Sequence, residues 1–233
     1  MALTRDEVVA AAIRLLDEEG LSGLTLRRLA KELGISAPTL YWHVKDKREL
    51  LDLMAERIIA EHRVKQPPLP DDMTWWQKVT ELCRRQYFAM IAHRDGAQVV
   101  AGNRPTERML PMIDRWIGIW IQAGIPPEEA LALILAVGNY IIGSALEYQA
   151  EADRTKVRGD IVAISQAGKE QHPNLMNAIN CRGSKPRDPH AIFEYGLTLL
   201  IAGIRARFPD LANGEGKDVA SGTKTKGKAL ANR

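Results

Sequence analysis

Apolar residues recur at intervals of three or four along most of the chain, and strand-like alternation of apolar and polar residues is almost absent. This spacing predicts a succession of α-helices and therefore an all-α fold. The first helix should begin at a capping box, Thr4 to Glu7, and end at Gly20. In the N-terminal part of the chain we expect helices over residues 5–20, 25–33, 36–44 and 47–63.

A proline-rich segment at residues 66–72 interrupts the helical pattern. It predicts a break between a small N-terminal unit and a larger helical body. Residues 152–186 have no sustained periodicity and predict a long loop with one short helix, and the composition from residue 213 onward predicts a disordered tail. Beyond the break we expect long helices over residues 75–92, 106–123, 127–151 and 189–208.

The composition is that of an ordinary globular protein, with 45% hydrophobic and 26% charged residues among 233. Two cysteines, Cys83 and Cys181, cannot form a disulfide framework and have no second ligand at metal-binding spacing. The N-terminus is acidic within seven residues, which excludes a signal peptide, and glycine and polar residues interrupt the longest apolar run. We therefore expect a cytoplasmic protein with no membrane span, no metal and no cofactor.

Residues 24–44 contain two short helical segments joined at Leu-Gly-Ile-Ser, which is the pattern of a helix-turn-helix. Gly34 supplies a left-handed turn residue, and Ser36 can cap the second helix. The apolar residues are spaced to pack the two helices together and against the first helix: Leu26, Leu29, Ala30, Leu33, Ile35 and Leu40. The residues left to project from the second helix are Ala37, Thr39, Tyr41, Trp42 and His43.

The charge of the chain is concentrated on this motif. Residues 25–48 carry a net charge of +4, whereas residues 1–24 carry −3. A local basic surface favours contact with DNA phosphates, and exposed Tyr, Trp and His side chains favour a partner that covers them. The alternative is an antiparallel helix pair with a solvated basic face. The whole-chain charge of +3 adds little, because residues 213–233 alone contribute +3.

Five short motifs carry a resemblance to a known family. They are Pro-Thr-Leu-Tyr-Trp-His-Val-Lys (38–45), Lys47-Arg48, His93-Arg-Asp-Gly-Ala97, Gly102-Asn-Arg-Pro105 and Leu146-Glu147. With them the chain from residue 4 to Phe208 resembles the tetracycline repressor family of bacterial transcription regulators, and residues 152–186 match poorly. The resemblance implies a helix-turn-helix DNA-binding domain (1–46), a connecting helix (47–65), and a ligand-binding and dimerisation domain (73–209), with the tail at 213–233.

The resemblance implies a homodimer that places one recognition helix per subunit in successive major grooves of a palindromic, double-stranded operator. Ala37 stands where tetracycline-binding members carry a glutamine that pairs with adenine, so the operator should differ at that position. Arg27, at the end of the preceding helix, is expected to contact guanine, and Lys47 to bind a phosphate. The recognition-helix residues placed at the DNA are Ala37, Pro38, Thr39, Tyr41, Trp42 and His43.

The dimer of the family forms from two long helices per subunit, for which residues 127–151 and 189–208 are the candidates. The first is apolar nearly all round, at Leu131, Ile134, Val137, Ile141 and Ala145. The second carries Ile192, Leu199, Leu200 and Ile204. Some of these positions are expected to be core within one chain rather than interface.

The resemblance also implies a small-molecule site in the helical body. Val100 stands where tetracycline-binding members carry a histidine that ligates magnesium, and valine has no lone pair to offer. We therefore expect an aromatic or polycyclic inducer rather than magnesium-tetracycline. Glu147 lies in an apolar helix and should pair either with a ligand cation or with Arg104. The ligand-site residues are Arg63, Leu82, Gln86, Val100, Asn103, Arg104, Pro105, Trp116, Asn139 and Glu147.

The function implied is a repressor that leaves its operator when a small molecule occupies this site. The ligand would shift the helix at 47–63, with Arg63 as a lever, and so change the separation of the two recognition helices. One alternative is an all-helical interaction or small-molecule-binding module without operator function. Another is an all-helical enzyme, although the five histidines show no metal spacing and no phosphate loop or nucleophile elbow occurs.

Overall fold

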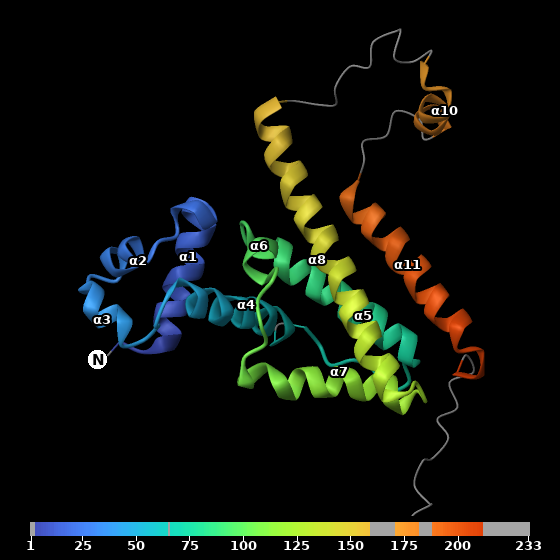
Figure 1. Cartoon of the computed structure of the whole chain (residues 1–233), viewed down its shortest axis with the longest axis horizontal. Coiled ribbons are helices and arrows are strands. Elements are labelled where there is room, and N and C mark those ends of the chain that lie inside the picture. Colours follow the sequence, from blue (N-terminus) through green and yellow to red (C-terminus); the bar gives the residue numbers. More distant parts are fainter. Residues whose placement is uncertain (1–2, 65, 159–170, 182–187, 212–233) are drawn as a thin grey trace, which may run out of the picture.

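The computed structural model describes residues 3–64, 66–158, 171–181 and 188–211, and these residues form helices and no strands (Figure 1). The predicted all-α fold is therefore confirmed. The elements are α1 (Arg5–Gly23), α2 (Leu26–Glu32), α3 (Ala37–Tyr41), α4 (Lys47–Val64), α5 (Trp75–Ile91), α6 (Gly96–Val100), η1 (Glu107–Met109), α7 (Leu110–Gln122), α8 (Pro127–Arg158), α10 (Pro173–Cys181), α11 (Pro189–Arg207) and η2 (Pro209–Leu211).

The first helix begins and is interrupted where its sequence predicts. The hydroxyl of Thr4 accepts a bond from the Glu7 amide at 3.2 Å, and the Glu7 carboxylate accepts one from the Thr4 amide at 2.7 Å. Gly20 has a left-handed, non-helical backbone, with φ at 75°, which kinks α1. The regular helix therefore stops at Gly20, as predicted, and a further short turn within α1 continues to Gly23.

The buried apolar side chains form two hydrophobic clusters. The first is built from α1 to α4, with Leu15, Leu29 and Met54 among its fully buried side chains. The second lies among α5, α7, α8 and α11 and contains Trp120 and Phe193. The long helix α4 runs from the first cluster toward the second (Figure 1), so it physically joins the N-terminal unit to the body.

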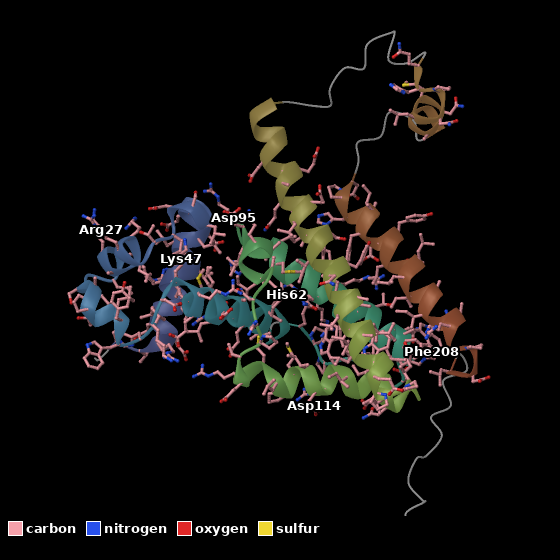
Figure 2. All side chains as sticks on the ribbon, in the orientation of Figure 1. Arg27, Lys47, His62, Asp95, Asp114 and Phe208 are labelled. Atoms are coloured by element: carbon pink, nitrogen blue, oxygen red, sulfur yellow. The ribbon has the colours of Figure 1, made fainter. Side chains whose placement is uncertain are left out.

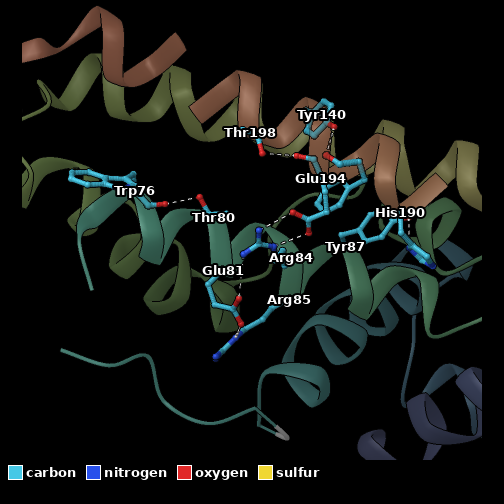
Figure 3. Close-up of polar contacts among 11 residues, drawn as sticks. Trp76, Thr80, Glu81, Arg84, Arg85, Tyr87, Tyr140, His190, Glu194 and Thr198 are labelled. Atoms are coloured by element: carbon cyan, nitrogen blue, oxygen red, sulfur yellow. Dashed lines mark hydrogen bonds and ion pairs between the residues drawn. The ribbon is translucent and has the colours of Figure 1, made fainter. Parts of the chain in front are cut away.

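The body is held together through α5, which packs against α8 and α11. Arg84 of α5 makes a bidentate contact with Glu194 of α11, at 2.7 Å and 2.8 Å (Figure 3). The ring of Tyr87 stacks on Phe193 with centroids 4.0 Å apart. Tyr140 of α8 donates to the Phe193 carbonyl at 2.7 Å, so the three long helices share one aromatic centre.

Three expectations about the body need correction. The helix expected over 106–123 begins as the 3₁₀ turn η1 and continues as α7 from Leu110, with Pro111 in its first turn. Helix α8 extends beyond residue 151 to Arg158, whereas the short helix α10 confirms the one short helix predicted within residues 152–186. The five-residue helix α6 was not expected at all. The predicted tail at 213–233 lies outside the described residues.

Helix α8 has one buried face and one exposed apolar face. Val137, Ile141 and Ala145 are buried in the protomer, whereas Leu131 and Leu135 are 51% and 60% exposed. Within the described part of the chain, α8 is the helix whose apolar stretch is long enough to cross a membrane by length and composition. In α11 the pattern repeats, because Leu197 and Ile201 are buried while Ile192 and Leu199 are exposed.

Candidate DNA-reading surface and ligand site

The helix-turn-helix is fixed by local capping and by a glycine turn. Thr25 caps α2 by accepting from the Arg28 amide at 3.1 Å, and Ser36 caps α3 by accepting from the Thr39 amide at 3.3 Å. Gly34 joins the two helices with φ at 66°, as its position in the sequence predicts. Leu40 of α3 is fully buried in the first hydrophobic cluster, so it anchors this short helix, and α3 packs against α2.

The outer surface of α3 is exposed and aromatic. Ala37, Pro38 and Thr39 are exposed, Tyr41 is 54% exposed and Trp42 is 86% exposed. Such exposure of large aromatic side chains is unusual on a protein surface without a partner. Because α3 ends at Tyr41, the helix is shorter than expected, and Trp42 and His43 lie just after it.

His43 is the one predicted DNA residue of this segment that is only half-exposed. Its backbone carbonyl accepts from Arg5 Nε at 2.8 Å, and Arg5 also lies 3.4 Å from Glu49. These contacts tie the end of the recognition segment to the starts of α1 and α4.

The basic residues around the motif divide into free and engaged groups. Arg27 is exposed, as are Lys31 and Lys45, but it lies in the first turn of α2 and not, as expected from the sequence, at the end of that helix. Arg28 instead contacts Glu19 at 2.8 Å and Glu32 at 3.0 Å, and these hydrogen bonds raise the pKa of its guanidinium. The local charge available to a polyanion is therefore smaller than the sequence count suggests.

Helix α4 begins at Lys47, which is exposed. Asp46 accepts from the Glu49 amide at 2.8 Å, and Glu49 accepts from the Lys45 amide at 2.6 Å. These two carboxylates occupy amide donors that a phosphate could otherwise use, and the exposed Lys47 side chain lies at the same helix end.

The predicted ligand-site residues come from α4 to α8, and neighbouring pairs of these helices pack together. Leu82 and Gln86 of α5 are half-buried, as are Val100 of α6 and Trp116 of α7. Val100 packs against both hydrophobic clusters, so it lies where the N-terminal unit meets the body. The side chain of Arg63 lies outside the described residues.

Asn103 has a structural partner. Its amide nitrogen donates to the Leu51 carbonyl of α4 at 3.3 Å and also to the Val99 carbonyl of α6. Arg48 of α4 donates to the carbonyl of Gly102 in the same loop. The segment after α6 is therefore bound to α4 by hydrogen bonds, which no periodicity in the sequence indicates.

The remaining predicted ligand residues are exposed in the protomer: Arg104, Pro105, Asn139 and Glu147. Glu147 is exposed in the protomer, so burial within one chain is not a reason for it to be paired, and its pairing with a ligand cation or with Arg104 stays a prediction. Among the described residues, His, Cys, Asp and Glu side chains form no group of three or more that could hold a metal ion.

The α5–α6 corner, residues 92–97, is a feature that sequence reasoning placed only as a turn. Asp95 has φ at 54°, in the left-handed region, and α6 begins at Gly96. Figure 2 shows Asp95 beside the N-terminal helices, although it lies far from α1 in the sequence. The Asp-Gly pair was the available signal for the turn, but its contacts with α1 are long-range and leave no local pattern.

Comparisons with known proteins match both parts of the chain. The family model described as bacterial regulatory proteins, tetR family, matches residues 8–54, and the tetracyclin repressor-like C-terminal domain matches residues 67–208. The tetracycline repressor protein class E of Escherichia coli is 33% identical over 208 residues, covering 89% of this chain and 93% of the relative. Class A from transposon 1721 is 34% identical over 214 residues, covering 92% and 96%.

Solved structures agree. TetR from Acinetobacter baumannii AYE superimposes with a TM-score of 0.67 at 34% identity, covering 89% of this chain and 98% of that one. ActR of Streptomyces coelicolor, in complex with (S)-DNPA, gives 0.74 at 30% identity, covering 89% and 100%. The fold and surface thus define a helix-turn-helix transcriptional repressor with a ligand-binding C-terminal domain. The chain belongs to the tetracycline repressor (TetR) family.

The predicted family and function class are therefore confirmed. The curated relatives are transcriptional regulators, not enzymes. Regulators of this family are dimeric, soluble, cytoplasmic proteins that bind operator DNA and small molecules. The roles of individual residues in this chain remain predictions, and they are taken up below.

Proposed function

We propose that this protein is a homodimeric repressor that binds a palindromic operator and leaves it when a small molecule occupies the C-terminal domain. The observation that carries the proposal is the exposed aromatic surface of the α3 segment, which Tyr41 and Trp42 form. Arg27 and the lysines on either side of this segment in the sequence are also exposed. A buried anchor beneath α3 and an aromatic, hydroxyl-bearing outer surface suit a major groove.

Contacts with the operator divide by chemistry. Lys47, at the first turn of α4, binds a phosphate, while Arg27 reaches a guanine. The α3 surface reads base edges and thymine methyl groups through Ala37, Pro38, Thr39, Tyr41, Trp42 and His43. Ala37 has no hydrogen-bonding group, so it cannot pair with adenine as glutamine can. The operator of this protein accordingly differs there from that of the tetracycline-binding relatives.

The partner in the dimer is a second copy of the chain. Leu131 and Leu135 of α8, with Ile192 and Leu199 of α11, are apolar and exposed in the protomer. Two such helix pairs, related by a two-fold axis, cover each other's apolar surface in a four-helix bundle. A partner protomer therefore accounts for the exposed apolar face of α8, and we place the protein in the cytoplasm rather than in a membrane.

The inducer is a small aromatic or polycyclic molecule. The residues that we assign to its site are Arg63, Leu82, Gln86, Val100, Asn103, Arg104, Pro105, Trp116, Asn139 and Glu147. Relatives support the ligand class, because solved structures hold minocycline in a TetR variant of Acinetobacter baumannii and (S)-DNPA in ActR. Magnesium-tetracycline is not the inducer proposed here, since Val100 cannot ligate a cation.

Release from the operator follows from differential binding. A ligand that prefers one position of α4 and α6 shifts the two recognition helices, and operator DNA must then weaken ligand binding by the same factor. We assign no catalytic residue and no resident cofactor to this protein.

The test is a ligand screen read out on the operator complex. Aromatic and polycyclic compounds are added to the protein bound to its selected operator, and release is followed by fluorescence anisotropy. We expect at least one class to release the DNA and to raise the thermal midpoint of the free protein. We expect tetracycline with magnesium to do neither. Release by magnesium-tetracycline at comparable concentration would contradict the assignment of Val100.

A further inference from the structure

The α5–α6 corner is bound to helix α1 of the N-terminal unit by a dense set of polar contacts. The Asp17 carboxylate accepts from the Arg94 amide at 3.1 Å and lies 3.0 Å from His93 Nδ1. Arg94 Nη1 donates to the carbonyl of Glu18 at 2.9 Å. Three consecutive corner positions, 93 to 95, thus contact one short stretch of α1.

The bend in α1 belongs to this contact. In a straight helix the Leu21 amide would donate to the carbonyl four residues earlier, but the left-handed Gly20 interrupts that bond. The Leu21 amide donates instead to Asp95 Oδ2 at 2.7 Å. A Cβ atom on Gly20 would lie 2.8 Å from the same oxygen, so the Asp95 carboxylate lies against the backbone of α1 as closely as glycine permits.

On its other side the corner is bound to α8 by one residue. Gln149 donates to the carbonyl of His93 at 2.7 Å and to that of Met90 at 3.3 Å. Its side-chain oxygen accepts from the Ala97 amide at 3.1 Å. Gln149 therefore provides hydrogen-bond partners for backbone groups at the end of α5 and at the start of α6, and it fixes the corner relative to α8.

The result is a continuous chain of contacts from α8 through the corner to α1, separate from the covalent connection through α4. Helix α8 carries the exposed apolar face assigned above to the dimer, and α1 packs directly against the helix-turn-helix. We call the exposed surface of α3, with Tyr41 and Trp42, the reading surface. A displacement of α8 or of the corner must therefore move the reading surface or break these hydrogen bonds.

We propose that the α5–α6 corner clamps the reading surface of each subunit, so that the two surfaces of a dimer have the separation that the operator requires. Asp17 and Gln149 are the positioning residues of this clamp. The inference rests on the proposed function, because it concerns the spacing of two recognition helices in a dimer. Asp17 contacts neither α3 nor the groups expected at DNA, so it acts through the orientation of α1 and not by touching bases.

The test compares Asp17→Ala with a matched control, Glu18→Ala. Both remove one negative charge from exposed positions on the same helix, but Glu18 contributes only its backbone carbonyl to the corner. The wild-type protein is first used to select its palindrome from random DNA. Each variant is then titrated against that palindrome, a single half-site, and palindromes with one or two base pairs added to or removed from the centre.

For Asp17→Ala we expect roughly tenfold weaker binding to the selected palindrome relative to Glu18→Ala, within the usual range of coupling between sites. Half-site affinity should match that of the control within about twofold, and the preference for one spacing should flatten. Gln149→Leu, which acts from the α8 side, should flatten the spacing preference in the same way, and circular dichroism checks that it remains folded.

Two results would overturn the clamp. One is an equal loss on half-site and palindrome, which would mean that Asp17 supports the fold of the reading surface itself. The other is an unchanged spacing preference in Asp17→Ala. Failure of the proposed function is separate, because a protein without operator activity would select no two-fold symmetric site in the first step.

Discussion

Trp42 has the most exposed large apolar side chain among the residues that the structure describes. It is 86% exposed, while Leu40, two residues earlier, is fully buried. The contrast follows from helical geometry, because Trp42 continues the turn of α3 as its C-cap residue and helical positions two residues apart face nearly opposite sides. Sequence periodicity alone was enough to separate the buried anchors of this motif from its outward residues, because the capping of α3 is local.

Replacing Trp42 should affect DNA binding and not stability. For Trp42→Ala we expect a loss of about 1–3 kcal/mol in operator affinity, the size of one good base contact. The free energy of unfolding should change by less than about 0.5 kcal/mol, because the side chain is exposed. Anisotropy titration and denaturant unfolding measure the two quantities. Leu110→Ala, at an exposed apolar position on α7, is the control that should change neither, and operator affinity of Trp42→Ala equal to wild type would contradict the assignment.

Cys83 illustrates a residue whose chemistry is set by burial. It is fully buried in α5, and burial raises the pKa of its thiol from 9.0 to about 12. In the unfolded chain the thiol ionises near its ordinary pKa. Folding is therefore favoured by this group below about pH 9, and that contribution is lost as the pH rises further.

We expect the free energy of unfolding to fall above about pH 9, by up to ~1.4 kcal/mol per pH unit from this group. In Cys83→Ala that part of the slope should be absent. Urea unfolding at pH 8 to 10 measures both proteins. Alkylation at pH 8 should leave Cys83 unmodified in the native protein and modify it in denaturant. A native thiol that reacts at the unfolded rate would show that the site opens readily.

At the scale of elements, the sequence predicted the helices whose ends are encoded locally. The capping box at Thr4, the glycine turn at Gly34 and the cap at Ser36 each lie within a few residues of the helix that they define. Helix α6 was missed because five residues are too short for periodicity, and it is held by Gln149, some 50 positions away. The interruption of α1 at Gly20 was predictable, but the long-range contact from Asp95 that accompanies it has no local signal in the sequence.

Glycine substitutions separate backbone strain from close approach. Gly34→Ala places a Cβ in open space at φ 66°, so we expect only the left-handed penalty of about 1–2 kcal/mol. Gly20→Ala has a similar φ and also brings the Cβ within 2.8 Å of Asp95, so it should destabilise the protein more. Gly118→Ala in α7 meets nothing closer than 3.9 Å and should be neutral or stabilising. Denaturant unfolding ranks the three, and a Gly20→Ala protein as stable as Gly34→Ala would exclude the tight approach.

At the scale of the whole molecule, the two hydrophobic clusters meet at α4, α6 and the corner, and α8 and α11 leave an apolar face uncovered. The sequence predicted which two helices carry this face, but not which of their residues are core. Val137 and Ile141 turned out to be buried within one protomer, because α5 and α11 cover that side of α8. Only a tertiary arrangement distinguishes the two faces of a helix that is apolar nearly all round.

Charging the uncovered face should separate the protomers. Leu135→Asp combined with Leu199→Asp introduces carboxylates at positions that are 60% and 55% exposed in one chain, so each protomer should still fold. Light scattering after size-exclusion chromatography should give the mass of one chain instead of two. Operator affinity should fall to that of a half-site, because the two reading surfaces are no longer linked. A variant that remains dimeric with unchanged circular dichroism would place the interface elsewhere.

The most direct test of the account is selection of binding sites from random double-stranded DNA with the full-length protein. We expect a two-fold symmetric site whose half-sites are centred about one helical turn, ~34–36 Å, apart. Its affinity should fall steeply with salt, as phosphate contacts require. At the position read by residue 37, the selected base should change when Ala37→Gln is used. Enrichment of no sequence, or of an asymmetric one, would contradict the assignment of this protein as an operator-binding dimer.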